Sequence, residues 1–161
     1  MKNLILIRHA KSSWDTPLID KERSLATRGI KDAHLVATTI KNSIPSKNLI
    51  WSSTAKRATE TAIIFAQNLS WPLESIIFRD ELYTFDSTVL EKIIKSCQDS
   101  YENVILFGHN EAITEFVNKF GDIYIDNVPT SGFVSIQFET QNWASIKNGK
   151  TNKTLFPKDL K

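Results

Sequence analysis

The chain has 161 residues, a length typical of one domain, and its hydrophobic and charged fractions of 41% and 24% are those of an ordinary globular protein. The formal net charge is only +2 and the basic residues form no run or stripe, so a nucleic-acid partner is not indicated. No apolar run approaches a membrane span, the N-terminal one is too short for a signal-peptide core, and the single Cys97 excludes an internal disulfide framework. We therefore expect one domain over residues 1–161, located in the cytoplasm, with no membrane partner.

Short apolar runs alternate with helical periodicity along most of the chain. The runs predict four strands, and a 3.6-residue apolar period predicts a helix after each of them, with a polar loop before the first helix. The predicted strands are residues 3–7, 48–52, 75–79 and 103–108. The predicted apolar helix positions are Ile30, Ala33, Ala37 and Ile40; Ala58, Ala62, Phe65 and Leu69; Val89, Leu90, Ile93, Ile94 and Cys97; and Ile113, Phe116, Val117 and Phe120.

The C-terminal part has a different pattern. Apolar and polar residues alternate over residues 133–139, which predicts a half-exposed strand, and we place it at an edge of the sheet. Asn148-Gly149 predicts a hairpin turn between residues 143–147 and 150–156. The overall β-α alternation predicts an α/β fold, a three-layer α/β/α sandwich whose mostly parallel central sheet has an antiparallel edge strand.

Polar and charged residues follow the predicted strands. Arg8-His9 follows the first strand, Arg57 lies in the first turn of the helix after the second, and His109 follows the fourth. Ligands of parallel sheets bind beyond the carboxyl ends of the strands, so we expect these side chains to converge there. Helix N-termini and guanidinium groups bind phosphate, and a neutral imidazole can attack phosphorus near physiological pH. The pattern therefore predicts a phosphoryl-transfer site.

The chain resembles the histidine phosphatase superfamily, and within it the small phosphohistidine phosphatases of the SixA type. The matching stretches are LIRHAKSSW, ERSLATRG, WSSTAKRATETA, RDELY, FGHN and VPTSG, which occur in family order and cover nearly the whole chain. The resemblance implies that His9 is the nucleophile and becomes a phosphohistidine. It implies that Arg8 and Arg57 bind the phosphoryl oxygens and that His109 donates to them in the transition state. It also implies that Arg23 reaches the phosphate.

Three further expectations concern single residues. Glu81 is the candidate general acid, because a glutamate in this region protonates the leaving oxygen in larger members of the superfamily. A phosphohistidine substrate needs such an acid less, since water can protonate a leaving imidazole near neutral pH. Ser53 either caps the helix that follows it or lines the pocket, and we expect capping. The histidines lack the spacing of metal ligands, so we expect no metal and no other cofactor.

The substrate class follows from the short connection after Glu81. Only a few residues separate it from the helix starting near Ser87, whereas sugar-phosphate mutases carry long insertions that roof the site. We therefore expect a cofactor-independent phosphohistidine phosphatase that acts on a phosphohistidine-bearing protein, through a site that phosphate, sulfate or tungstate can occupy. Two alternatives remain open, a small-molecule phosphomonoesterase on the same scaffold and a non-catalytic phosphate- or phosphoprotein-binding module. The sequence leaves the oligomeric state open.

Overall fold

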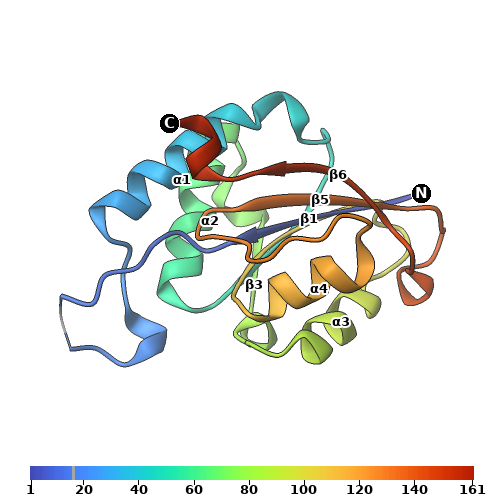
Figure 1. Ribbon diagram of the computed structural model, residues 1–161, viewed down its shortest axis with the longest axis horizontal. Helices are drawn as coiled ribbons and strands as arrows, with labels where there is room; N and C mark the ends of the chain where they lie inside the picture. The colour runs from blue at the N-terminus through green and yellow to red at the C-terminus, as the bar shows by residue number, and fades with distance from the viewer. Residues whose placement is uncertain (16) are drawn as a thin grey trace.

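The computed structural model describes residues 1–15 and 17–161. Its centre is a six-stranded sheet in the order β3-β2-β4-β1-β5-β6 (Figure 1). The first four strands run parallel to one another, and β5 pairs antiparallel with both of its neighbours. The strands are β1 Lys2–Arg8, β2 Leu49–Ser53, β3 Ile76–Arg79, β4 Asn103–Gly108, β5 Phe133–Phe138 and β6 Lys150–Leu155. The helices are α1 Thr27–Thr39, α2 Lys56–Leu69, α3 Ser87–Lys95 and α4 Ala112–Phe120. The predicted three-layer α/β/α sandwich is confirmed.

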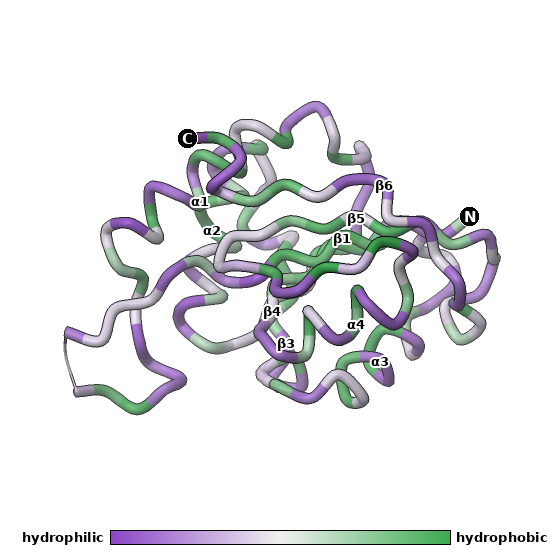
Figure 2. The backbone as a smooth tube through the Cα atoms, in the orientation of Figure 1, coloured by the Kyte–Doolittle hydropathy of each residue, from purple (hydrophilic) through white to green (hydrophobic). Residues whose placement is uncertain are grey.

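Alternate side chains of β1 supply the two halves of the core, as the two-residue period of a strand requires. Leu4 and Leu6 pack with the apolar residues of α3 and α4, whereas Ile5 and Ile7 pack with those of α1 and α2. Burying one such side chain fully stabilises the fold by about 1.5–3 kcal/mol. Figure 2 shows the hydrophobic colour concentrated along the sheet, whereas both colours alternate along the outer helices. Both faces of β1 and β4 are thus covered, and their polar residues collect at the strand ends.

The helices match the predicted ones except at two core positions. Ile30 is 41% exposed and Val89 is 39% exposed, so their expected burial is wrong. Both residues lie in the first turn of a helix, before the helix lies fully over the sheet. Cys97 is buried as expected, but it lies beyond the end of α3. Among residues 1–15 and 17–161, no helix is both long and apolar enough to cross a membrane.

Strand β5 lies inside the sheet between β1 and β6, so its expected place at an edge is wrong. The antiparallel edge strand is β6 instead. The side chains of Val134 and Ile136 enter the core on the α3/α4 side, whereas Ser135 lines a groove on the opposite face. Phe133, on the face of Ser135, is fully buried, so this face is only partly covered. The apolar-polar alternation of the strand reflects this partial cover and carries no information about neighbouring strands.

The connection from β5 to β6 comprises residues 139–149, so the expected tight hairpin between residues 143–147 and 150–156 is wrong. Trp143–Ser145 forms a 3₁₀ turn, because the fully buried Trp143 indole anchors it in the core and donates to the Tyr101 carbonyl at 2.7 Å. Asn148 does adopt the left-handed backbone that such a turn signal favours, with φ of 47°.

Candidate active site

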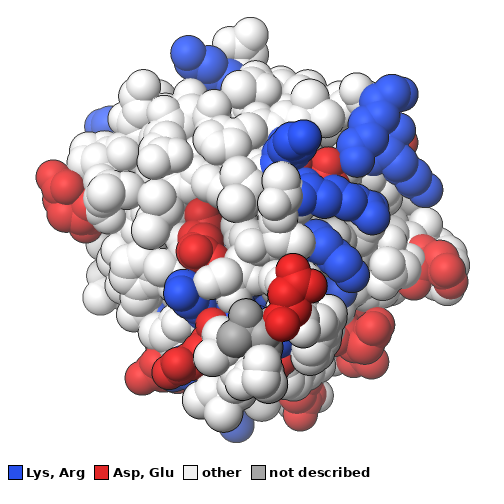
Figure 3. All heavy atoms as spheres, turned by 90° about the vertical axis from the view of Figure 1, so that its left-hand side faces the viewer, with Lys and Arg blue, Asp and Glu red and all other residues white. Residues whose placement is uncertain are grey.

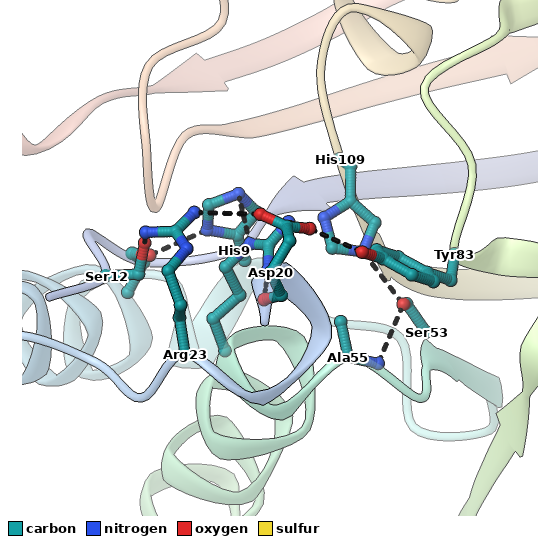
Figure 4. A network of polar contacts seen from close by, with 10 residues as sticks. His9, Ser12, Asp20, Arg23, Ser53, Ala55, Tyr83 and His109 are labelled. Atoms are coloured by element: carbon teal, nitrogen blue, oxygen red, sulfur yellow. Dashed lines mark hydrogen bonds and ion pairs between the residues drawn. The ribbon is translucent and has the colours of Figure 1, made fainter. Parts of the chain in front are cut away.

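Two histidines meet at the carboxyl ends of the central strands. In the parallel pair β1 and β4, Arg8 lies opposite Gly108, so the next residues, His9 and His109, leave the sheet side by side. The backbone N–H of His9 donates to the Gly108 carbonyl at 3.0 Å. The two imidazole centroids are 5.2 Å apart (Figure 4), and the residues are only 7% and 1% exposed. The pairing of two neighbouring strands thus fixes the distance between the two rings.

The hydrogen bonds of His9 define its protonation state. Nδ1 lies 2.7 Å from the Ala10 carbonyl oxygen, which can only accept, so Nδ1 carries the ring proton. The lone pair is then on Nε2, and the Arg57 Nε–H donates to it at 3.4 Å. Burial lowers the pKa of His9 to about 3, and the guanidinium groups of Arg57 and Arg8 also lower it. His9 is therefore neutral at physiological pH, the state that a nucleophile requires.

His109 is neutral as well and offers a hydrogen-bond donor. Its Nε2 lies 2.8 Å from the Ser53 hydroxyl, which also accepts from the Ala55 N–H at 3.2 Å. Among the described residues the Ser53 hydroxyl has no other acceptor for its proton, so it donates to Nε2, and the imidazole proton is then on Nδ1. Nδ1 is buried, and within the described part of the chain it has no partner. Burial, followed by the neighbouring His9, lowers the pKa of His109 to about 2.

The expected capping role of Ser53 is wrong. The N-cap of α2 is Ala55, which makes no side-chain cap, and the Ser53 hydroxyl is used to orient His109. Ser53 is the last residue of β2, the strand beside β4, and this position brings its side chain to the imidazole that follows β4.

Two arginines are held together at the mouth of the site by one carboxylate. Arg57, at the start of α2, is 2% exposed, and Arg23, from the loop before α1, is 6% exposed. Arg57 Nη2 donates to the Asp20 carboxylate at 3.0 Å, and Arg23 Nη2 donates to it at 3.2 Å. Arg23 Nη1 donates to the Ser12 hydroxyl at 2.6 Å, and its guanidinium lies over the Trp14 ring at 3.5 Å. Two of the three arginines expected to bind phosphate are therefore joined through this carboxylate.

Arg8 approaches from the other side, where the segment 128–131 runs. Its Nη1 donates to the Val128 carbonyl at 2.9 Å, and its buried Nε has no partner among the described residues. The Ser131 N–H donates to the carbonyls of Arg8 and His9 at 3.1 Å each, with Ser131 at φ of 61°. This segment therefore fixes the backbone of the Arg-His pair.

Glu81 lies outside this cluster. Its side chain is 52% exposed and forms an ion pair with Arg79 at 2.6 Å. The hydrogen bond from its own backbone N–H, together with that from Arg79, lowers the pKa of its carboxyl. A carboxyl that is ionised at neutral pH and bonded to Arg79 is poorly prepared to donate a proton, and its acid role stays a prediction.

Two residues of the site escape prediction from the sequence pattern, Asp20 and Tyr83. The Tyr83 hydroxyl donates to the Asp20 carboxylate, and the Tyr83 ring lies 5.3 Å from that of His109. Tyr83 belongs to the RDELY stretch, so a motif match could have identified it. Asp20 lies in a polar loop without periodicity. Its negative charge is also unexpected at a site that binds an anion.

The site combines two neutral imidazoles with three guanidinium groups, a set that suits a tetrahedral oxyanion. Figure 3 views the molecule from the end at which β1 stops, and both acidic and basic side chains surround that end. Within residues 1–15 and 17–161, no group of three or more histidine, cysteine, aspartate or glutamate side chains is placed to hold a metal ion.

Solved structures with this fold include several phosphatases. SixA from Agrobacterium tumefaciens has a TM-score of 0.80 at 24% identity, with 96% of this chain and 97% of that chain covered. The protein histidine phosphatase SixA, solved with tungstate, has a TM-score of 0.82 at 20% identity and 99% coverage of both chains. Mycobacterial glucosyl-3-phosphoglycerate phosphatase has a TM-score of 0.70 at 12% identity, with 95% of this chain and 98% of that chain covered.

Sequence relatives are found among mycobacterial proteins. An uncharacterized protein of Mycobacterium leprae is 29% identical over 112 residues, which are 67% of this chain and 66% of that protein. One of Mycobacterium tuberculosis is 25% identical over 154 residues, which are 89% of this chain and 93% of that protein. The model of the histidine phosphatase superfamily (branch 1) matches residues 4–86, just over half of the chain, and this segment holds His9 and Arg57. The chain belongs to the histidine phosphatase superfamily, branch 1.

Proposed function

We propose that this protein is a phosphohistidine phosphatase of the SixA type, which removes the phosphoryl group from a histidine of another protein. The observation that carries the proposal is the state of His9, a neutral imidazole whose Nδ1 is tied to the Ala10 carbonyl and whose Nε2 lone pair faces Arg57. The likeness to two SixA structures supports the same class. Location in the cytoplasm stays a prediction.

The first step transfers the phosphoryl group to the protein. His9 Nε2 attacks phosphorus in line, a P–N bond forms, and the bond from phosphorus to the departing imidazole nitrogen breaks. That nitrogen takes its proton from water. Arg8, Arg57 and the Nδ1–H of His109 stabilise the charge on the equatorial oxygens. Because Arg57 Nε donates to His9 Nε2, the guanidinium must turn toward the phosphoryl group as it binds.

The second step regenerates the enzyme. A water oxygen attacks phosphorus, the P–N bond to His9 breaks, and inorganic phosphate leaves with one proton of that water. The second proton neutralises the hydroxide that the first step produced. The Nε2 lone pair returns, while the Ala10 carbonyl holds the Nδ1 proton throughout. The same donors serve both steps, so no residue needs to change its protonation state between them.

An open site supports a protein substrate. Only residues 83–86 connect the 3₁₀ turn Asp80–Leu82 to α3, so this connection is too short to form a roof. Phe85, beside the His109 ring at 5.6 Å, is 52% exposed, which leaves an apolar surface at the rim of the site. A phosphate carried on a protein surface can reach such a site.

A small-molecule phosphomonoesterase is the second candidate. The fold likeness to glucosyl-3-phosphoglycerate phosphatase favours it. An alkoxide leaving group needs a proton donor, however, and the carboxyl of Glu81 is bonded to Arg79. A non-catalytic binding module is disfavoured because a phosphate-binding role alone does not require an unprotonated imidazole nitrogen in the anion site.

The test compares a histidine-phosphorylated protein with p-nitrophenyl phosphate as substrates. His9→Ala should lose about 10³-fold or more in turnover, a loss typical of removing a nucleophile, while the fold remains. His34→Ala is the matched control, because His34 is exposed on α1 and its side chain bonds only to Asn68 among the described residues. Glu81→Gln should leave phosphohistidine turnover nearly unchanged. The phosphomonoesterase would be favoured if p-nitrophenyl phosphate were turned over faster than the phosphorylated protein and if Glu81→Gln lost most of this ester turnover.

A further inference from the structure

The carboxylate of Asp20 accepts from two of the arginines that are assigned to the phosphoryl group. Its Oδ1 accepts from Arg23 Nη2 at 3.2 Å, and its Oδ2 accepts from Arg57 Nη2 at 3.0 Å and from the Tyr83 hydroxyl. Figure 4 shows this carboxylate between the two imidazoles and the Arg23 side chain. Two oxygens of one anion thus accept from three donors, as the oxygens of a phosphoryl group would.

Asp20 and His9 together engage all three nitrogens of the Arg57 guanidinium. Nη1 donates to the Asp20 backbone carbonyl at 2.7 Å, Nη2 donates to the Asp20 carboxylate, and Nε donates to His9 Nε2. Three of the five N–H donors of Arg57 are thus in use, and a phosphoryl group that takes the Nη2 donor bonded to the carboxylate must displace Asp20 from it. A carboxylate and a phosphoryl dianion cannot share these donors, because like charges at hydrogen-bond distances repel strongly.

The carboxylate can be displaced, whereas the arginines cannot. The Asp20 side chain is 42% exposed, whereas those of Arg23 and Arg57 are 7% and 3% exposed. Asp20 opens the 3₁₀ turn Asp20–Glu22 in a surface loop, next to the exposed Ile19. A displaced carboxylate is rehydrated by water, so its departure leaves two buried guanidinium groups ready for another anion.

Asp20 stays charged under working conditions. Partial burial opposes its ionisation, but hydrogen bonds from Tyr83 and Arg57 outweigh this and lower its pKa to about 2. The competition for the arginines is therefore between a permanent monoanion and the incoming ligand.

We infer that Asp20 is a specificity-determining residue, a built-in monoanion that holds Arg23 and Arg57 until a more highly charged tetrahedral oxyanion displaces it. Phosphoryl dianions gain enough from the two guanidinium groups to displace the carboxylate. Chloride and simple carboxylates carry one charge and gain too little. The inference rests on the proposed function in one respect, that these arginines bind the phosphoryl group.

The test measures tungstate binding by isothermal titration calorimetry, which requires no turnover. Asp20→Asn should bind tungstate about tenfold or more tightly than the unmodified protein, because the competing charge is gone. Added chloride should weaken tungstate binding more in Asp20→Asn than in the unmodified protein. Asp80→Asn is the matched control, because this nearby exposed carboxylate bonds to Lys21 and Thr54 and touches neither site arginine. It should change the dissociation constant less than about twofold.

Equal or weaker tungstate binding by Asp20→Asn would overturn the inference and would make Asp20 a residue that positions the arginines. An equal gain in Asp80→Asn would also overturn it, since the effect would then be one of overall charge. Asp20→Ser serves as a second variant, and thermal melting without ligand checks that both variants fold. A protein that binds tungstate as expected but never forms a phosphoenzyme would refute the proposed catalysis and leave this inference standing.

Discussion

Replacement of Arg57 by glutamine should separate catalysis from stability. The guanidinium supplies a fork of two donors, and each hydrogen bond to a charged group contributes about 1.5–3 kcal/mol. Loss of both hydrogen bonds should raise the free energy of the transition state by about 3–6 kcal/mol, which lowers kcat/KM by roughly 10²–10⁴. In other enzymes, removal of a single oxyanion donor lowers kcat by about 10²–10³. The fold should lose much less, about 1–2 kcal/mol, because the 42% exposed carboxylate of Asp20 can turn to water once its partner is gone.

The assay is steady-state turnover of a histidine-phosphorylated protein, combined with urea unfolding of the same variants. Arg79→Gln is the matched control, since Arg79 lies at the carboxyl end of the neighbouring strand β3 but pairs with Glu81 and lies over the Trp51 ring at 4.6 Å. It should keep turnover within about threefold. Turnover of Arg57→Gln within threefold of the unmodified protein, or an equal loss in Arg79→Gln, would refute the assignment of Arg57 to the phosphoryl group.

Three further predictions concern protonation and orientation. The rate of His9 phosphorylation, measured by rapid quench, should be nearly independent of pH from about 8 to 5, because burial lowers the pKa of His9 to about 3. A rate that falls by half near pH 6.5 would instead show that His9 titrates as an ordinary imidazole. Since the pKa values of both His9 and His109 are lowered on folding, the unfolded chain binds more protons below pH 6.5. The free energy of unfolding in urea should therefore be fully maintained above that pH and should fall between 6.5 and about 3, with a shallower fall in His109→Gln. Ser53→Ala removes the hydroxyl that bonds to His109 Nε2 and should lower kcat about tenfold with little change in KM. Recovery in Ser53→Thr would confirm a positioning role, whereas an unchanged kcat in Ser53→Ala would contradict it.

The sequence predicts the framework because its signals are local and periodic. The solid apolar runs of β1 and β4 mark strands covered on both faces, and parallel strands bring their ends together, so the approach of His9 and His109 follows from topology alone. The pattern cannot define where along a helix its burial begins, and it therefore misses that Ile30 and Val89, in the first turns of α1 and α3, are exposed. It also cannot distinguish an edge strand from an internal strand with one partly covered face, which is the case of β5.

The site itself is predicted only in part. Residues at strand ends or in the first turn of a helix, such as Arg8 and Arg57, have positions that the fold fixes. Asp20 belongs to a loop whose path is set by long-range contacts, including the bonds of its carboxylate to Arg57 and Tyr83. The loop also packs against α1, where Gly29 lies next to the Lys11 carbonyl. Only glycine permits this approach, because a Cβ at residue 29 would lie 2.1 Å from the carbonyl oxygen. Such contacts leave no periodic trace in the sequence.

The most direct measurement is the identity of the phosphorylated nitrogen. The protein is treated with phosphoramidate, trapped in alkali, where P–N bonds survive, and analysed by peptide mapping and ³¹P NMR. The phosphoryl group should be on Nε2 of His9, because Nδ1 is bonded to the Ala10 carbonyl, and it should be absent from His9→Ala. A phosphoryl group on His109, or on Nδ1 of His9, would contradict the account.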